Sequence, residues 1–171
     1  MNSGRRTEYK NKFGKKRINV NTIDVHKIFF TVMGEPVGKG RPKFARQWNY
    51  VKTYTPEKTA SYENLVKLEY QRQTATDKKA LFSFNEDTPL LLDIKAYFKI
   101  PKSTSKKRKA LMEKGKIRPT KKPDIDNVFK AIADSLNGIA YKDDSQIISG
   151  TVSKFYSEQP RVEVTITKAS E

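Results

Sequence analysis

The residues that decide the fold are KPDIDNVFKAIADSLNG, at positions 122–138. Pro123 fixes its own φ and disfavours a helical conformation in the residue before it, so a helix can begin only after the proline. Asp124 or Asp126 suits the N-cap, where a carboxylate accepts hydrogen bonds from the free amides of the first turn. The helix is predicted to end at Asn137-Gly138, because Gly adopts the left-handed conformation of a helix end without strain. Its apolar stripe, at helical spacing, consists of Phe129, Ile132, Ala133 and Leu136.

Acidic residues gather around this helix, although the protein as a whole is strongly basic. Asp126, Lys130 and Asp134 follow at i, i+4 and i+8, so their side chains line up along one face of the helix. Asp143 and Asp144 come after the helix, just before a strand-like run. Carboxylates at the start of a helix and at the mouth of a strand could converge on a divalent metal, and Mg²⁺ suits such oxygen ligands. The simpler alternatives are helix capping for Asp124 and Asp126 and a turn for Asp143 and Asp144. Asp134 is taken as a structural residue that could orient Lys130.

The composition limits the classes of function. A chain of 171 residues is long enough for one core and too short for two ordinary domains. The net charge of +16 points to a polyanionic partner, for which nucleic acid is the default. The absence of cysteine and the single histidine, His26, exclude disulfides, thiol nucleophiles and cysteine- or histidine-rich metal sites. No membrane-spanning run or secretory segment is evident, so we expect a cytoplasmic protein, without a small-molecule cofactor.

In chain order, residues 1–22 are expected to form a flexible basic arm, and residues 23–171 a single domain. Runs rich in apolar, β-branched and aromatic residues predict four strands, the first starting near the histidine. The expected strands are 27–33, 89–100, 146–156 and 161–167. Helices are expected after Thr55-Pro56, a capping hydroxyl followed by a proline, and for a turn or two within 105–113. These elements predict a compact α+β domain, with a mixed sheet of about four strands and two to three helices.

Two basic segments are candidates for contact with DNA. The loop 34–44 contains three glycines and two prolines but lacks the spacing of a phosphate-cradling Walker loop. Its cations, which could reach DNA phosphates, are Lys39, Arg41 and Lys43. An ordinary basic turn is the simpler interpretation of this loop. The block 101–122 ends in Lys121-Lys122 and leads directly into the acidic cluster, so we expect it to contact DNA.

Three motifs together resemble the RusA-like Holliday junction resolvases, a family of phage and prophage endodeoxyribonucleases. The first is KPDIDN at 122–127, with the lysine four residues after its second aspartate and the Asp, Leu and Asn that follow on the same helix. The second is KDDSQI at 142–147, and the third is the basic PVGKGRP at 36–42. The resemblance extends from about residue 27 to the end of the chain. The combination and separation of the motifs make it specific.

The resemblance implies a homodimeric, Mg²⁺-dependent enzyme that nicks symmetrically related strands of a four-way DNA junction, in recombination and repair. The essential acids of the family would correspond to Asp124, Asp126 and Asp144, and its essential lysine to Lys130. Asp143 also matches and would be a further metal ligand. The acids would hold one or two Mg²⁺ ions, for which Mn²⁺ could substitute, and the lysine would neutralise charge at the scissile phosphate.

Two alternatives remain open at the level of the sequence. A non-catalytic basic protein that binds nucleic acid would explain the charge equally well, but it would leave the acidic cluster without a role. A nuclease with the same chemistry could instead act on flaps or replication forks.

Overall fold

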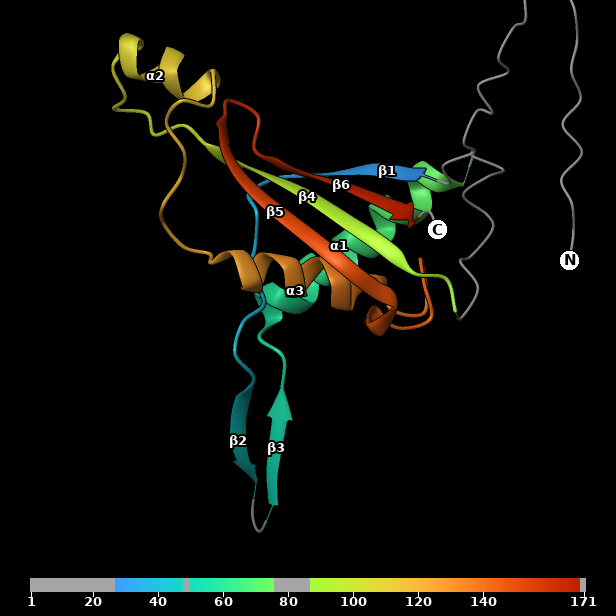
Figure 1. Ribbon diagram of the computed structural model, residues 1–171. Coiled ribbons are helices and arrows are strands. Elements are labelled where there is room, and N and C mark those ends of the chain that lie inside the picture. The colour runs from blue at the N-terminus through green and yellow to red at the C-terminus, as the bar shows by residue number, and fades with distance from the viewer. Residues whose placement is uncertain (1–26, 48–49, 76–86, 170–171) are drawn as a thin grey trace, which may run out of the picture.

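The computed structural model describes residues 27–47, 50–75 and 87–169. Its centre is a four-stranded sheet in the order β1-β6-β4-β5, in which β4 runs parallel to β5 and the other neighbours are antiparallel (Figure 1). The strands are β1 (Lys27–Met33), β2 (Lys43–Gln47), β3 (Tyr50–Tyr54), β4 (Leu90–Lys99), β5 (Ile147–Ser157) and β6 (Arg161–Lys168). The helices are α1 (Glu57–Thr74), α2 (Lys106–Glu113) and α3 (Ile125–Leu136), with a 3₁₀ turn η1 (Asp144–Gln146). The α+β fold with a mixed four-stranded sheet is therefore confirmed.

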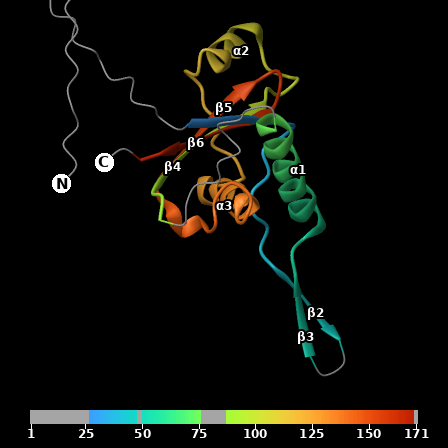
Figure 2. The same ribbon diagram turned by 90° about the vertical axis from the view of Figure 1, so that its right-hand side faces the viewer.

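The core lies between one face of the sheet and two helices. Side chains of β4 alternate between buried and exposed, as period-two alternation in a strand requires. The buried set on this strand is Leu90, Leu92, Ile94, Ala96 and Phe98. Figure 2 shows α1 and α3 on the same side of the sheet, where α1 packs against β1 and α3 packs against β5. Strand β4 is central in the sheet, because it lies between β6 and β5.

Helix α3 forms where the sequence predicted it. Asp124 is its N-cap residue, and the helix ends at Leu136, before Gly138 with a φ of +70°. Its apolar stripe enters the core, and Ile132 and Leu136 are fully buried. Phe129 packs over Gly150 of β5, at a point where an added Cβ would lie 2.3 Å from the phenyl ring. Glycine in this strand thus allows the helix to approach the sheet closely.

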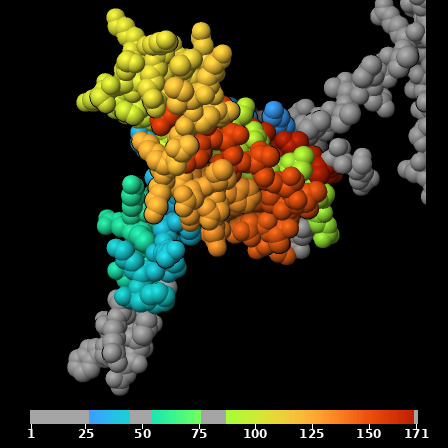
Figure 3. Space-filling model, turned by 60° about the vertical axis from the view of Figure 1, so that its left-hand side comes forward, coloured from blue at the N-terminus to red at the C-terminus, as the bar shows by residue number. Residues whose placement is uncertain are grey.

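Strands β2 and β3 form a separate antiparallel ribbon that the sequence did not indicate. The ribbon projects from the body of the molecule, at the opposite end from α2 (Figures 1 and 3). The ribbon does not pack on the main sheet. Its own sequences therefore lack the apolar alternation that identifies a half-buried strand. The expected capping by Thr55 is also wrong, because Pro56 is the N-cap of α1 and makes no side-chain cap bond.

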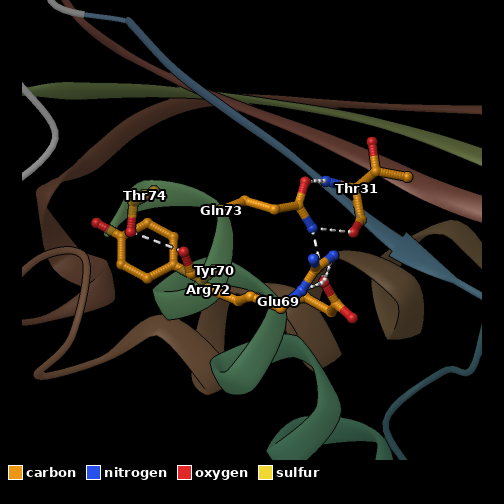
Figure 4. Close-up of polar contacts among 6 residues, drawn as sticks. All are labelled: Thr31, Glu69, Tyr70, Arg72, Gln73 and Thr74. Carbon is orange, nitrogen blue, oxygen red and sulfur yellow. Dashed lines mark hydrogen bonds and ion pairs between the residues drawn. The ribbon is translucent and has the colours of Figure 1, made fainter. Parts of the chain in front are cut away.

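The C-terminal end of α1 is tied to the edge strand β1 by one side chain (Figure 4). The Gln73 side chain accepts a hydrogen bond from the Thr31 amide at 2.9 Å and donates one to the Thr31 carbonyl at 2.7 Å. Glu69 accepts a further bond from Gln73 and pairs with Arg72 at 2.8 Å, and these hydrogen bonds lower the pKa of Glu69. Gln73 therefore provides hydrogen-bond partners for the backbone N–H and C=O of Thr31, which have no neighbouring strand at this edge of the sheet.

Helix α2 forms within the expected segment 105–113 and lies beside the C-terminal half of β5. Arg118, from the basic block, stacks 3.7 Å above the centroid of the Phe155 ring, and Lys109 pairs with Glu158. Part of the basic block is thus bound to the body of the protein. None of the described helices is long and apolar enough to cross a membrane. The expected basic arm at 1–22 and His26 lie outside the described residues.

Candidate functional site

A cavity of about 780 Å³ lies between α3 and β5, and it receives residues from both acidic motifs. Its lining consists of Ile125, Asp126, Phe129, Lys130, Ala133, Asp144, Gly150 and Val152. Figure 3 shows α3 and β5, in orange to red, side by side on one face of the molecule. The structure therefore brings together Asp126, Lys130 and Asp144, as the sequence led us to expect for the centre of the site.

Local structure explains the position of these three charges. Asp126 lies in the first turn of α3, where the helix dipole favours a negative charge, and Lys130 follows one turn later on the same face. Asp144 begins the turn η1, which precedes β5 directly. The carboxylate of Asp126 and the ammonium group of Lys130, both on α3, thus line the same cavity as the carboxylate of Asp144, which lies just before the edge strand β5.

Asp143 has a structural role that fixes this turn. Its carboxylate accepts a hydrogen bond from the Ser145 amide at 2.9 Å, and the hydrogen bonds from the side chain and the amide of Ser145 lower the pKa of Asp143. The side chain of Gln146 completes a capping box and also donates to the Thr88 carbonyl at 3.1 Å. Asp143 does not line the cavity, but its cap holds the neighbouring Asp144 in place.

Asp124 stands at the edge of the site and not in its lining. Its side chain is exposed and makes no helix-cap hydrogen bond, although its carbonyl accepts one from the Val128 amide at 3.1 Å. Within the described ranges, no three Asp, Glu, His or Cys residues are grouped closely enough to hold a metal ion. The cavity itself offers two carboxylates, which still fits Mg²⁺, because this ion commonly takes one or two carboxylates and completes its shell with waters and phosphate oxygens.

The basic motif at 36–42 packs against the start of α3. The amide of Lys39 donates to the Asn127 carbonyl at 2.8 Å. A Cβ added to Gly38 would lie 2.7 Å from the Cβ of Pro123 and 3.0 Å from that of Asn127. The glycine is therefore required for close approach, a role that the sequence analysis missed. The pattern of two glycines flanking a lysine was the available signal.

The ammonium group of Lys39 joins two helices. Its Nζ lies 2.5 Å from Glu63 of α1 and 2.9 Å from Asp134 of α3. Burial disfavours the charged form, but the hydrogen bonds to Asp134 and Glu63 outweigh this effect and raise the pKa of Lys39. Asp134 has the structural role that was expected of it, but its ion-pair partner is Lys39 from the distant loop and not Lys130, the partner that the helical spacing offered.

The other predicted DNA-contacting cations are exposed. Arg41 and Lys43 lie at the base of the β2–β3 ribbon, and Lys121 and Lys122 precede α3. The segment that carries the last two is held to β5 because Lys154 donates to the Pro123 carbonyl at 3.0 Å. All four side chains are exposed, and their contact with DNA stays a prediction.

Comparison with known proteins gives two matches. Residues 33–167 match the protein family described as Endodeoxyribonuclease RusA, a range that includes every residue of the cavity. The chain is also 43% identical over 148 residues to the uncharacterized protein YqaN of Bacillus subtilis (strain 168). That alignment covers 84% of this chain and 97% of the Bacillus protein.

Proposed function

Because the chain belongs to the RusA endodeoxyribonuclease family, we propose that it is a Mg²⁺-dependent nuclease that resolves four-way DNA junctions by paired, symmetric nicks. The observation that carries the proposal is the convergence of Asp126, Lys130 and Asp144 on one cavity. A basic protein that only binds nucleic acid has no use for two carboxylates in such a place, because they repel phosphate.

Each residue of the cavity has a role that follows from its chemistry. Asp126 and Asp144 would hold the metal, with the exposed carboxylate of Asp124 close enough in sequence to join them when DNA binds. A bound Mg²⁺ would supply Lewis-acid stabilisation of the phosphate and an activated water. Lys130 would place a positive charge beside the phosphate oxygens, where negative charge develops during hydrolysis. Asp143 would act by holding the turn that carries Asp144.

The remaining parts of the proposal concern the partners. The net charge of +16 supports binding of branched DNA, and the exposed Arg41, Lys43, Lys121 and Lys122 are the proposed phosphate contacts. A second copy of the chain would place two equivalent sites on a junction that has near two-fold symmetry, and this symmetry is what paired nicks require.

The test is cleavage of a synthetic four-way junction in Mg²⁺ by the wild type, Asp126→Asn and Asp87→Asn. Asp87 is an exposed aspartate outside the cavity, so its variant controls for the loss of one negative charge. We expect paired nicks at symmetric positions from the wild type and Asp87→Asn, and binding without nicks from Asp126→Asn. Binding by all three proteins with no nicks would leave a DNA-binding protein, and preferential cutting of flaps or forks would assign a different branched substrate.

A further inference from the structure

The cavity has more apolar surface than phosphate hydrolysis needs. Five of its eight lining residues are apolar or glycine, namely Ile125, Phe129, Ala133, Gly150 and Val152. Six waters around a metal ion would fill only about 180 Å³ at roughly 30 Å³ each, against a cavity of about 780 Å³. The cavity is open to solvent, and its size, mostly apolar lining and few charged groups fit a surface that receives part of an organic ligand.

Phe129 and Gly150 together form part of the apolar wall of this cavity. The ring of Phe129 rests on the backbone of Gly150, which allows the ring to lie against β5 and leaves the space beside it open. Ile125 is 53% exposed although it is a large aliphatic residue, and it directly precedes Asp126 in the first turn of α3. An exposed isoleucine beside a carboxylate that would hold a metal indicates that an apolar partner arrives together with the phosphate.

The charged side of the same cavity restricts what this apolar partner can be. A group that enters here must be flat or compact, must be largely apolar on its faces, and must be attached to a phosphodiester held at Asp126, Lys130 and Asp144. In DNA the nucleobase next to the scissile phosphate meets these conditions, because it is flat, has apolar faces and is joined to the phosphate through one sugar. The base must leave the stack to reach the cavity, as in other enzymes that draw a base out of the helix.

We propose that the apolar half of this cavity binds the nucleobase of one nucleotide flanking the scissile phosphate, in an unstacked position. This inference rests on the proposed nuclease function. It supplies a physical reason for structure selectivity, because a base at a branch point has fewer stacking partners than one inside a duplex and is drawn out at lower cost. Duplex DNA would bind to the same cations without placing a base in the cavity.

The experiment uses four-way junctions with 2-aminopurine at either nucleotide flanking the nick, after the nick position has been mapped in Mg²⁺. Fluorescence is recorded on titration with the whole protein, with Ca²⁺ in place of Mg²⁺ to slow cleavage. Stacking between neighbouring bases quenches 2-aminopurine, so withdrawal of the base from the stack into the cavity raises the signal. A junction labelled four nucleotides away serves as the DNA control, and its signal is expected to stay constant.

Two isoleucine variants form the matched protein pair. Ile125 and Ile148 are both exposed, but only Ile125 lines the cavity. We expect Ile125→Ala to abolish most of the fluorescence rise and to weaken junction binding by about fivefold, the order expected for the loss of one aliphatic contact. Ile148→Ala is expected to behave as the wild type in both measurements.

The outcomes separate this inference from the proposed function. A wild type that nicks junctions while the signal stays flat at both flanking positions overturns the nucleobase site and leaves the nuclease intact. Equal behaviour of the two isoleucine variants also overturns it, because the wall would then serve only to exclude water. Symmetric nicks with a fluorescence rise that depends on Ile125 support both the base site and the nuclease, whereas the absence of nicks in Mg²⁺ contradicts the nuclease before the labelled junctions are made.

Discussion

Replacement of Lys39 by methionine tests the role that the structure gives to the basic motif. The change keeps much of the length of the side chain and removes the charge that joins Glu63 to Asp134. The two carboxylates would then face each other in a partly buried space without a cation. We expect the variant to fold with lower stability and with a less rigid connection between α1 and α3.

The size of the effect follows from burial. The side chains of Lys39, Glu63 and Asp134 are 24%, 18% and 22% exposed, so the pairs lie between surface and interior. Exposed ion pairs contribute about 0–1 kcal/mol, whereas removal of one partner from a buried pair costs about 3–5 kcal/mol. We therefore expect a loss of about 2 kcal/mol in the free energy of unfolding. This loss corresponds to a Tm lowered by roughly 4–8 °C in a domain of this size.

The assay is urea denaturation followed by circular dichroism, with Lys58→Met as the control, because Lys58 is an exposed lysine on the same helix α1. The raised pKa of Lys39 means that the ion pair is fully present below the ordinary lysine value of 10.5 and is lost only above the raised value. The difference between wild type and Lys39→Met should therefore stay constant between pH 7 and pH 9. The triple variant with Glu63→Gln and Asp134→Asn should recover part of the stability.

Equal stability of Lys39→Met and Lys58→Met would refute this reasoning. A second readout separates support of the fold from contact with DNA. If Lys39 acts through its ion pairs with Glu63 and Asp134, its replacement should change the salt dependence of DNA binding less than Lys122→Met, which removes an exposed charge from the segment before α3. A larger change in salt dependence for Lys39→Met than for Lys122→Met would indicate that Lys39 contacts DNA phosphates directly.

Three further changes have defined consequences. Gly150→Ala should cost about 1–3 kcal/mol through overpacking against Phe129, and Phe129→Leu should relieve it in urea denaturation. Gln73→Leu should lower stability by about 1–3 kcal/mol, because both backbone groups of Thr31 lose their partner, and an unchanged midpoint would contradict the contacts. The lowered pKa of Asp143 means that its stabilising contribution is present above its ordinary value of 3.8 and is lost on acidification, so the deficit of Asp143→Ala should shrink in acid.

The parts of the site that the sequence predicted are those set by short-range rules. Helix α3 follows from Pro123, from the apolar stripe and from Gly138, all within one stretch. The approach of Asp144 to this helix could be expected because β5 begins just after it. The motif spacing that resembled RusA-like proteins pointed to the same residues.

The parts that were missed depend on distant contacts. Lys39 and Asp134 are far apart in the chain. From the sequence, a lysine in a loop rich in glycine and proline is equally compatible with exposure to solvent and with an ion pair to a distant carboxylate. The packing of Gly38 on Pro123 and Asn127, with the hydrogen bond from the Lys39 amide to Asn127, brings that lysine to the helix. The β2–β3 ribbon was missed because it projects from the body and lacks the buried alternation that identifies most strands.

The most direct measurement of the central claim is anomalous scattering from crystals of the protein grown or soaked with Mn²⁺ as a substitute for Mg²⁺. We predict a manganese peak between the carboxylates of Asp126 and Asp144, within the cavity beside Lys130, and its loss in crystals of Asp126→Asn. A peak held by other residues, or one that persists unchanged in Asp126→Asn, would contradict the assignment of this cavity as the catalytic metal site.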